Sequence, residues 1–97
     1  MLTEKLIMNK QEEQNQKFEF YGVPIVCTPN FLSTFGNDYM LVAFAAQALI
    51  AETYPNKNWD YLQTFRYKGI DFWCISDALQ DQVTLEPHIT FLMPEDY

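Results

Sequence analysis

Residues 60–77, which read DYLQTFRYKGIDFWCISD, decide the fold because they predict a β-hairpin. Lys68 and Gly69 form a two-residue turn, in which glycine supplies a positive φ. The register then pairs Tyr67 with Ile70, Arg66 with Asp71, Phe65 with Phe72, Thr64 with Trp73, Gln63 with Cys74, Leu62 with Ile75 and Tyr61 with Ser76. One of these pairs places opposite charges directly across the strands, which supports the register.

The two faces of this hairpin differ in composition. One face carries Phe65, Tyr67 and Phe72, and we expect it to pack on helices as part of the core. The other face is half apolar and centres on Trp73 and Ile75. Trp73 and its neighbours are therefore either covered by the N-terminal segment or exposed as a contact patch.

Two helices are predicted before the hairpin. Thr28 is a cap, Pro29 fits the first helical position and Gly36 fits just past the end, so a short helix lies between them. Asn37 caps a second, longer helix, which Pro55 bars from continuing. Because this second helix is apolar on almost every side, it is buried on most faces or lies at an interface.

Extended segments flank these elements. Residues 17–30, which read KFEFYGVPIVCTPN, form an extended segment that predicts an edge strand or a broken strand, because Pro24 cannot donate to a ladder. In this segment Val23, Ile25 and Cys27 share one phase. The last strand is expected before Pro94, with two alternating faces, one formed by Ile89, Phe91 and Met93 and the other by His88, Thr90 and Leu92.

The N-terminal residues 1–17 are mostly polar and form a separate segment in this interpretation. Thr3 caps a helix that begins at Glu4, and the segment is frayed or loosely docked, or orders only on a partner. Residues 18–97 then form a single α+β domain. Its two layers are a short helix plus a long buried helix, packed on a small, mainly antiparallel sheet of three to four strands.

The charge of the chain limits its partners. Thirteen acidic residues oppose six basic ones, for a net charge of −7, and no Lys or Arg follows Gly69. Such a chain is repelled by phosphate, so we expect neither direct nucleic-acid binding nor membrane binding. The acids either attract a protein partner with a basic surface or only confer solubility. Free thiols at Cys27 and Cys74 indicate a cytoplasmic protein.

Catalytic and metal chemistry has little support in the sequence, and no cofactor is expected. His88 is the single histidine, and a nucleophile–base pair would need it beside Cys27 or Cys74, both in apolar stretches. A small hydrolase would need one of these thiols accessible and acidic. Three carboxylates lie on a polar loop that is either solvated or a weak divalent-cation site. They are Asp77, Asp81 and Glu86.

Three short motifs carry a resemblance to a known group. They are Gly22, Val23 and Thr28, then Phe72, Trp73 and Ile75, and finally Leu92, Pro94, Glu95 and Tyr97. The chain resembles small bacterial, plasmid and phage domain-of-unknown-function families with an F-W-x-I-D strand and an L-x-P/A-E-x-Y C-terminus. The likeness covers residues 20–97 and departs at Ser76, where those families have Asp. It implies a fold and a mobile-element setting, but no activity.

These observations favour a non-enzymatic protein-binding module. Acids beside aromatic residues suit an inhibitor that occupies the basic groove of a nucleic-acid-processing enzyme, of anti-CRISPR or antirestriction type. The alternative is a structural homodimeric accessory domain, formed through the exposed sheet face or the long helix and without an inhibitory role. The predicted contact residues are Trp73, Asp77, Asp81, Glu86, Glu95 and Asp96.

Overall fold

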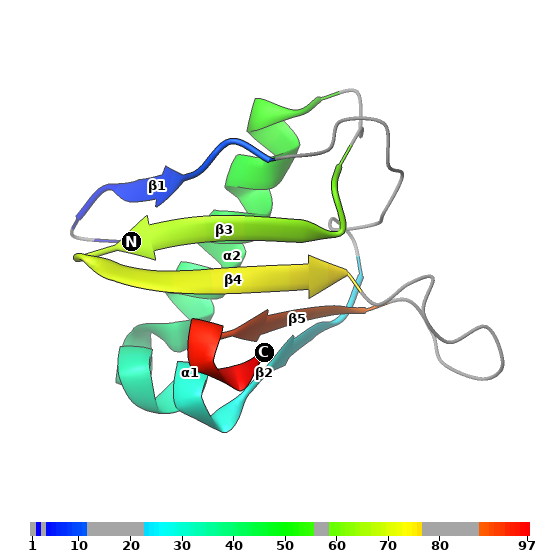
Figure 1. The fold of residues 1–97 in the computed structure, drawn as a ribbon. Helices are drawn as coiled ribbons and strands as arrows, with labels where there is room; N and C mark the ends of the chain where they lie inside the picture. Colours follow the sequence, from blue (N-terminus) through cyan, green and yellow to red (C-terminus); the bar gives the residue numbers. More distant parts are fainter. Residues whose placement is uncertain (1, 3, 12–22, 56–58, 77–87) are drawn as a thin grey trace, which may run out of the picture.

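The computed structural model describes residues 2, 4–11, 23–55, 59–76 and 88–97 (Figure 1). Several predictions lie outside these residues. Among them are the cap at Thr3, the boundary between residues 17 and 18, and the polar loop that carries Asp77, Asp81 and Glu86.

The described residues form an α+β fold, as predicted, with helices on one face of a five-stranded sheet (Figure 1). The strands are β1 (Leu6–Met8), β2 (Ile25–Cys27), β3 (Leu62–Tyr67), β4 (Ile70–Ser76) and β5 (Ile89–Leu92). Their order in the sheet is β1-β3-β4-β5-β2, with β2 parallel to β5 and the other pairs antiparallel. The prediction of three to four strands was therefore wrong, because it omitted β1.

The hairpin has the predicted register throughout, from Tyr67 opposite Ile70 to Leu62 opposite Ile75. Its turn has positive φ at both central residues, 53° at Lys68 and 74° at Gly69. Two successive positive φ values are typical of a type I′ turn, whose twist matches that of the flanking strands.

The helical region starts as the sequence predicts. Helix α1 (Pro29–Phe35) begins after Thr28, whose hydroxyl accepts a hydrogen bond from the backbone N–H of Phe31 at 3.3 Å. A 3₁₀ turn, η1 (Gly36–Asp38), leads directly into α2 (Tyr39–Thr53). The predicted cap at Asn37 was wrong, because this residue lies inside η1 and α2 begins without a side-chain cap.

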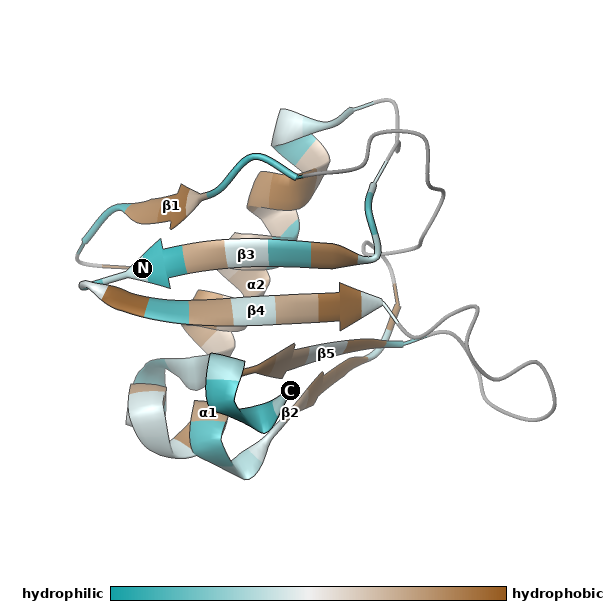
Figure 2. Cartoon of the chain, viewed as in Figure 1, coloured by the Kyte–Doolittle hydropathy of each residue, from teal (hydrophilic) through white to brown (hydrophobic). Residues whose placement is uncertain are grey.

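The core lies between these helices and the inner face of the sheet. Phe31 of α1 sits at its centre, with ring centroids 5.4 Å from Phe72 and 5.5 Å from Phe91. Phe65 stacks on Phe72 at 5.1 Å, so the predicted helix-facing side of the hairpin is buried. Figure 2 shows hydrophobic colours over most of α2 and β5, the elements that enclose this core.

The N-terminal segment differs from its prediction. Instead of a helix from Glu4, residues 6–8 form edge strand β1, which pairs with β3. Beyond β1, the side-chain oxygen of Gln11 accepts hydrogen bonds from Asp60 N at 3.0 Å and Gln63 Nε2 at 2.6 Å. Helix-forming composition was overridden here, because the chain gains a strand partner and a buried amide network.

Candidate functional site

The outer face of the sheet carries the predicted contact residue Trp73, because alternation along β4 places it opposite the core residues Phe72 and Cys74. The register aligns Trp73 with Thr64 on one side and Leu92 on the other. Apolar side chains extend across this face, and two of them, Ile7 and Val26, are 47% and 46% exposed. An apolar sheet face without a helix layer is a candidate contact surface.

The C-terminal turn covers part of this face. After β5 the chain forms a 3₁₀ turn, η2 (Pro94–Asp96), and the ring of Tyr97 meets Trp73 edge to face with centroids 5.5 Å apart. The hydroxyl of Tyr97 lies 3.3 Å from that of Tyr61. Tyr61, Trp73 and Tyr97 are named here the aromatic patch. The partial cover of Trp73 thus includes the C-terminal turn, which the sequence interpretation did not anticipate.

Asp96 holds this turn in place. Its carboxylate accepts hydrogen bonds from Thr28 Oγ1 at 2.7 Å, Met93 N at 2.9 Å and Asn30 Nδ2 at 2.6 Å. The hydroxyl of Thr28, followed by the N–H of Met93 and the amide of Asn30, keeps the pKa of this carboxyl below its usual range. Asp96 was predicted as a partner contact, but its carboxylate is engaged within the chain.

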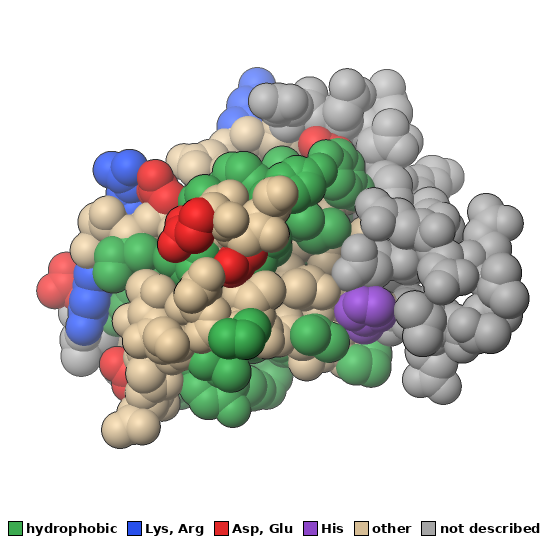
Figure 3. Space-filling model, turned by 60° about the horizontal axis from the view of Figure 1, so that its bottom comes forward, with side chains coloured by type: hydrophobic (Ala, Val, Ile, Leu, Met, Phe, Trp, Pro, Cys, Tyr) green, Lys and Arg blue, Asp and Glu red, His purple; other side chains and the backbone are tan. Residues whose placement is uncertain are grey.

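Of the other predicted acids, the structure describes only Glu95, which is exposed in η2 beside the aromatic patch. Asp71 adds a carboxylate on the outer face, and Arg66 Nε donates to it at 2.7 Å. Figure 3 shows acidic and hydrophobic side chains side by side, with Lys and Arg side chains towards the margin. The described part of the candidate surface therefore combines aromatic rings with carboxylates.

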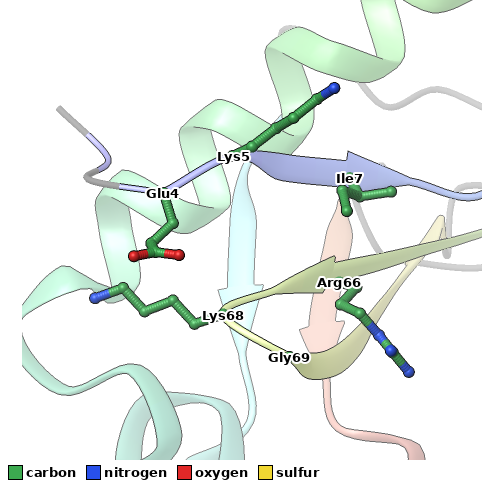
Figure 4. Close-up of a pocket in the computed structure, with 6 residues that line it drawn as sticks. All are labelled: Glu4, Lys5, Ile7, Arg66, Lys68 and Gly69. Carbon is green, nitrogen blue, oxygen red and sulfur yellow. The ribbon is translucent and has the colours of Figure 1, made fainter.

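A shallow hollow of about 550 Å³ lies at the other end of the sheet, beside the hairpin turn. Its lining includes the cationic residues Lys5, Arg66 and Lys68 (Figure 4). The figure shows their charged ends pointing in three different directions, and Arg66 is already paired with Asp71. An anion site needs donors that converge on one point, so this hollow is a weak candidate.

The geometry gives little support to cysteine chemistry. Cys74 is fully buried, and Cys27 packs against the same core, where burial raises the pKa of its thiol. A raised pKa disfavours the thiolate nucleophile. By strand alternation His88, just before β5, belongs to the outer face of the sheet, whereas Cys27 and Cys74 belong to the inner face, since both are aligned with the core residue Phe91. Within the described ranges, no cluster of three or more His, Cys, Asp or Glu is arranged to hold a metal ion.

No protein-family model, curated protein or solved structure matches this chain. The resemblance to domain-of-unknown-function families therefore stays a prediction. Across the part of the chain that the structure describes, no helix has the length and apolar character needed to cross a membrane.

Sequence reasoning missed Tyr61 and Tyr97 as members of the patch. Alternation along the hairpin assigns Tyr61 to the inner face, but Tyr61 precedes β3 at a bend, where alternation no longer sets direction. Tyr97 is the last residue of the acidic PEDY tail, which predicted either a frayed end or a hook for a partner. The sequence signal that could have found them was the apolar outer side of β4, where Trp73 and Ile75 must pack against some other part of the chain.

Proposed function

We propose that this chain is a small protein-binding module whose aromatic patch and neighbouring carboxylates dock a partner with a basic surface. The observation that carries the proposal is the edge-to-face pair of Trp73 and Tyr97 on the sheet face that no α-helix of the described residues covers, with Tyr97 65% exposed. Tryptophan and tyrosine supply much of the binding energy of protein interfaces. Carboxylates beside them attract basic partners and raise the rate of association.

The partner class that we propose is a nucleic-acid-processing enzyme, which this chain inhibits by occupying its basic groove, as an anti-CRISPR or antirestriction protein does. The net charge of −7 and the acids beside the patch support this choice. The exposed Glu95 and the predicted contacts Asp77, Asp81 and Glu86 supply the charge. Asp96 acts indirectly, because it holds the turn that carries Tyr97.

The test begins with capture of bacterial proteins on the immobilised chain at low and high salt, followed by purification of the captured enzyme. Direct binding is then measured for Trp73→Ala and for a charge reversal of Asp77, Asp81, Glu86 and Glu95 to Lys. Glu52→Lys on α2, in the other layer, is the charge-matched control for the single reversal Glu95→Lys, which is measured beside the fourfold variant. We expect Trp73→Ala and the charge reversal each to weaken binding of the enzyme tenfold or more, and Glu52→Lys to change this binding little. Nucleic acid should compete with the wild-type chain for the enzyme.

Two results would contradict the proposal. One is capture that does not depend on salt and leads to no nucleic-acid-processing enzyme. The other is a purified enzyme that binds the patch variants and the wild-type chain equally well. In the second case the contact lies on another face.

A further inference from the structure

Helix α2 exposes an apolar stripe on the side away from the core. Phe44 is 53% exposed, Leu41 is 42% exposed and Ala48 is also exposed. Their spacing of three and four residues places them on one face of the helix. The opposite face of α2 is buried in the core through Val42, Ala43, Ala46 and Ile50. This stripe lies on a different layer from the aromatic patch.

The charge pattern indicates what covers this stripe. No charged residue occurs between Tyr39 and Ala51, although the whole chain has a net charge of −7. A basic partner gains no ion pair on this surface. A second acidic copy, by contrast, meets no opposing carboxylate along the stripe. We propose that two copies of this chain associate through α2, with the two helices antiparallel.

The stripe is also self-complementary in size. A two-fold axis at the level of Ala46 places Phe44 opposite the other copy's Ala48, and Leu41 opposite its Ala51. Each large side chain then meets a small one, as close helix packing requires. The two Glu52 residues lie about 18 Å apart along the axis at 1.5 Å per residue. Each Glu52 does approach the other copy's Asp38, which leaves some repulsion at the ends.

The length of α2 sets the strength of the dimer. Its 15 residues span about 22 Å, so one helix pair covers less than the roughly 800 Å² per partner of a standard interface. The dimer is therefore weak and depends on concentration. Because both copies are acidic, added salt screens their repulsion and strengthens the dimer. Binding of a basic partner responds to salt in the opposite direction.

Sedimentation equilibrium of the full chain tests this proposal, at concentrations from about 10 µM to 1 mM and at about 50 and 500 mM salt. We expect the apparent mass to rise from one chain towards two, at lower concentration in high salt. Phe44→Glu should keep the mass of one chain throughout. Val26→Glu is the matched control, since Val26 is also an exposed hydrophobic residue but lies in β2. It should behave as wild type.

A wild-type chain that remains monomeric at every concentration overturns the proposal, as does equal weakening of the dimer by Phe44→Glu and Val26→Glu. Ala48→Glu provides a second variant on the stripe, and circular dichroism verifies that each variant is folded. Phe44→Glu should leave capture of a basic partner intact, because the aromatic patch lies on the other layer. Failure of the dimer is thus distinguishable from failure of the proposed function.

Discussion

The two described ends of the chain are attached to the same sheet in contrasting ways. Near the N-terminus, β1 extends the sheet, and the neutral amide of Gln11 is 5% exposed within a buried network. At the C-terminus, η2 lies on the outer face, and an exposed carboxylate, that of Asp96, holds it. One attachment is buried and neutral, and the other is exposed and charged.

This contrast teaches which end responds to solvent. A buried neutral hydrogen bond is costly to break but has no titration of its own. A carboxylate that accepts three hydrogen bonds loses acceptor capacity when it is protonated, so its attachment depends on pH. The end that carries Tyr97 of the aromatic patch is therefore the adjustable one.

The largest expected effect comes from removing the neutral attachment. Gln11→Ala takes the acceptor away from the N–H of Asp60 and from Gln63, both buried, and should cost about 2 kcal/mol in the free energy of unfolding. Urea denaturation measures this loss. Asn9→Ala is the control, because the side chain of Asn9 is exposed and its amide donates to the exposed hydroxyl of Thr64. If both variants lose the same free energy of unfolding, burial of the Gln11 network does not add to the stability of the fold.

A smaller effect on global stability is expected from the charged attachment. Asp96→Asn halves the acceptor oxygens that receive Thr28, Asn30 and Met93, so η2 should loosen and Tyr97 should leave Trp73. The indole N–H resonance of Trp73 should shift, while that of Trp59, bonded to Tyr54 O at 3.0 Å, stays in place. Glu95→Gln makes the same change of charge one residue away. An equal shift in that control would contradict the assigned role of Asp96.

Acidification should reproduce the effect of Asp96→Asn. The folded-state pKa of Asp96 is lowered, so its contribution is fully present above the ordinary carboxyl pKa of about 4 and is lost as pH falls through the lowered value. The resonance of Trp73 should therefore move at acidic pH in the wild-type chain. In the Asp96→Asn variant this transition should be absent. Its persistence there would assign the transition to another group.

The smallest effect comes from the turn between the two attachments. Lys68 has a φ of 53°, where asparagine is better tolerated than lysine, so Lys68→Asn should stabilise the fold by about 0.5 kcal/mol. Thermal unfolding measures this gain. Hydrogen exchange then sharpens the comparison: amides of β1 should gain protection with the core, whereas those of η2 should not. Equal gains at both ends would mean that both unfold only with the core.

Elements fixed by neighbouring residues could be predicted from the sequence. The hairpin register follows from its turn and from Arg66 opposite Asp71, and α1 follows from Thr28 and Gly36. Strand β1 could not be predicted, since three apolar residues in a polar segment have no strand signal of their own. They become a strand only because β3 offers an edge with free backbone groups.

The candidate site likewise has features that the sequence predicts and one that it does not. Local alternation predicted that Trp73 lies on the face away from the helices, and uniform hydrophobicity predicted that α2 is buried or lies at an interface. The role of Asp96 could not be predicted, because its partner Thr28 is distant in sequence. Contacts of this kind depend on which strands become neighbours, and the parallel pairing of β2 with β5 brings these two residues together.

That parallel pairing also sets an order of events during synthesis. Ile25 leaves the ribosome long before Ile89, the residue with which it aligns. The nascent chain can close its hairpin early, but β2 has no strand to join until the last strand has emerged. The sheet is therefore completed after translation of nearly all of the described chain, and the edge of β4, with which β5 pairs, stays open to chaperones and to other nascent chains until then.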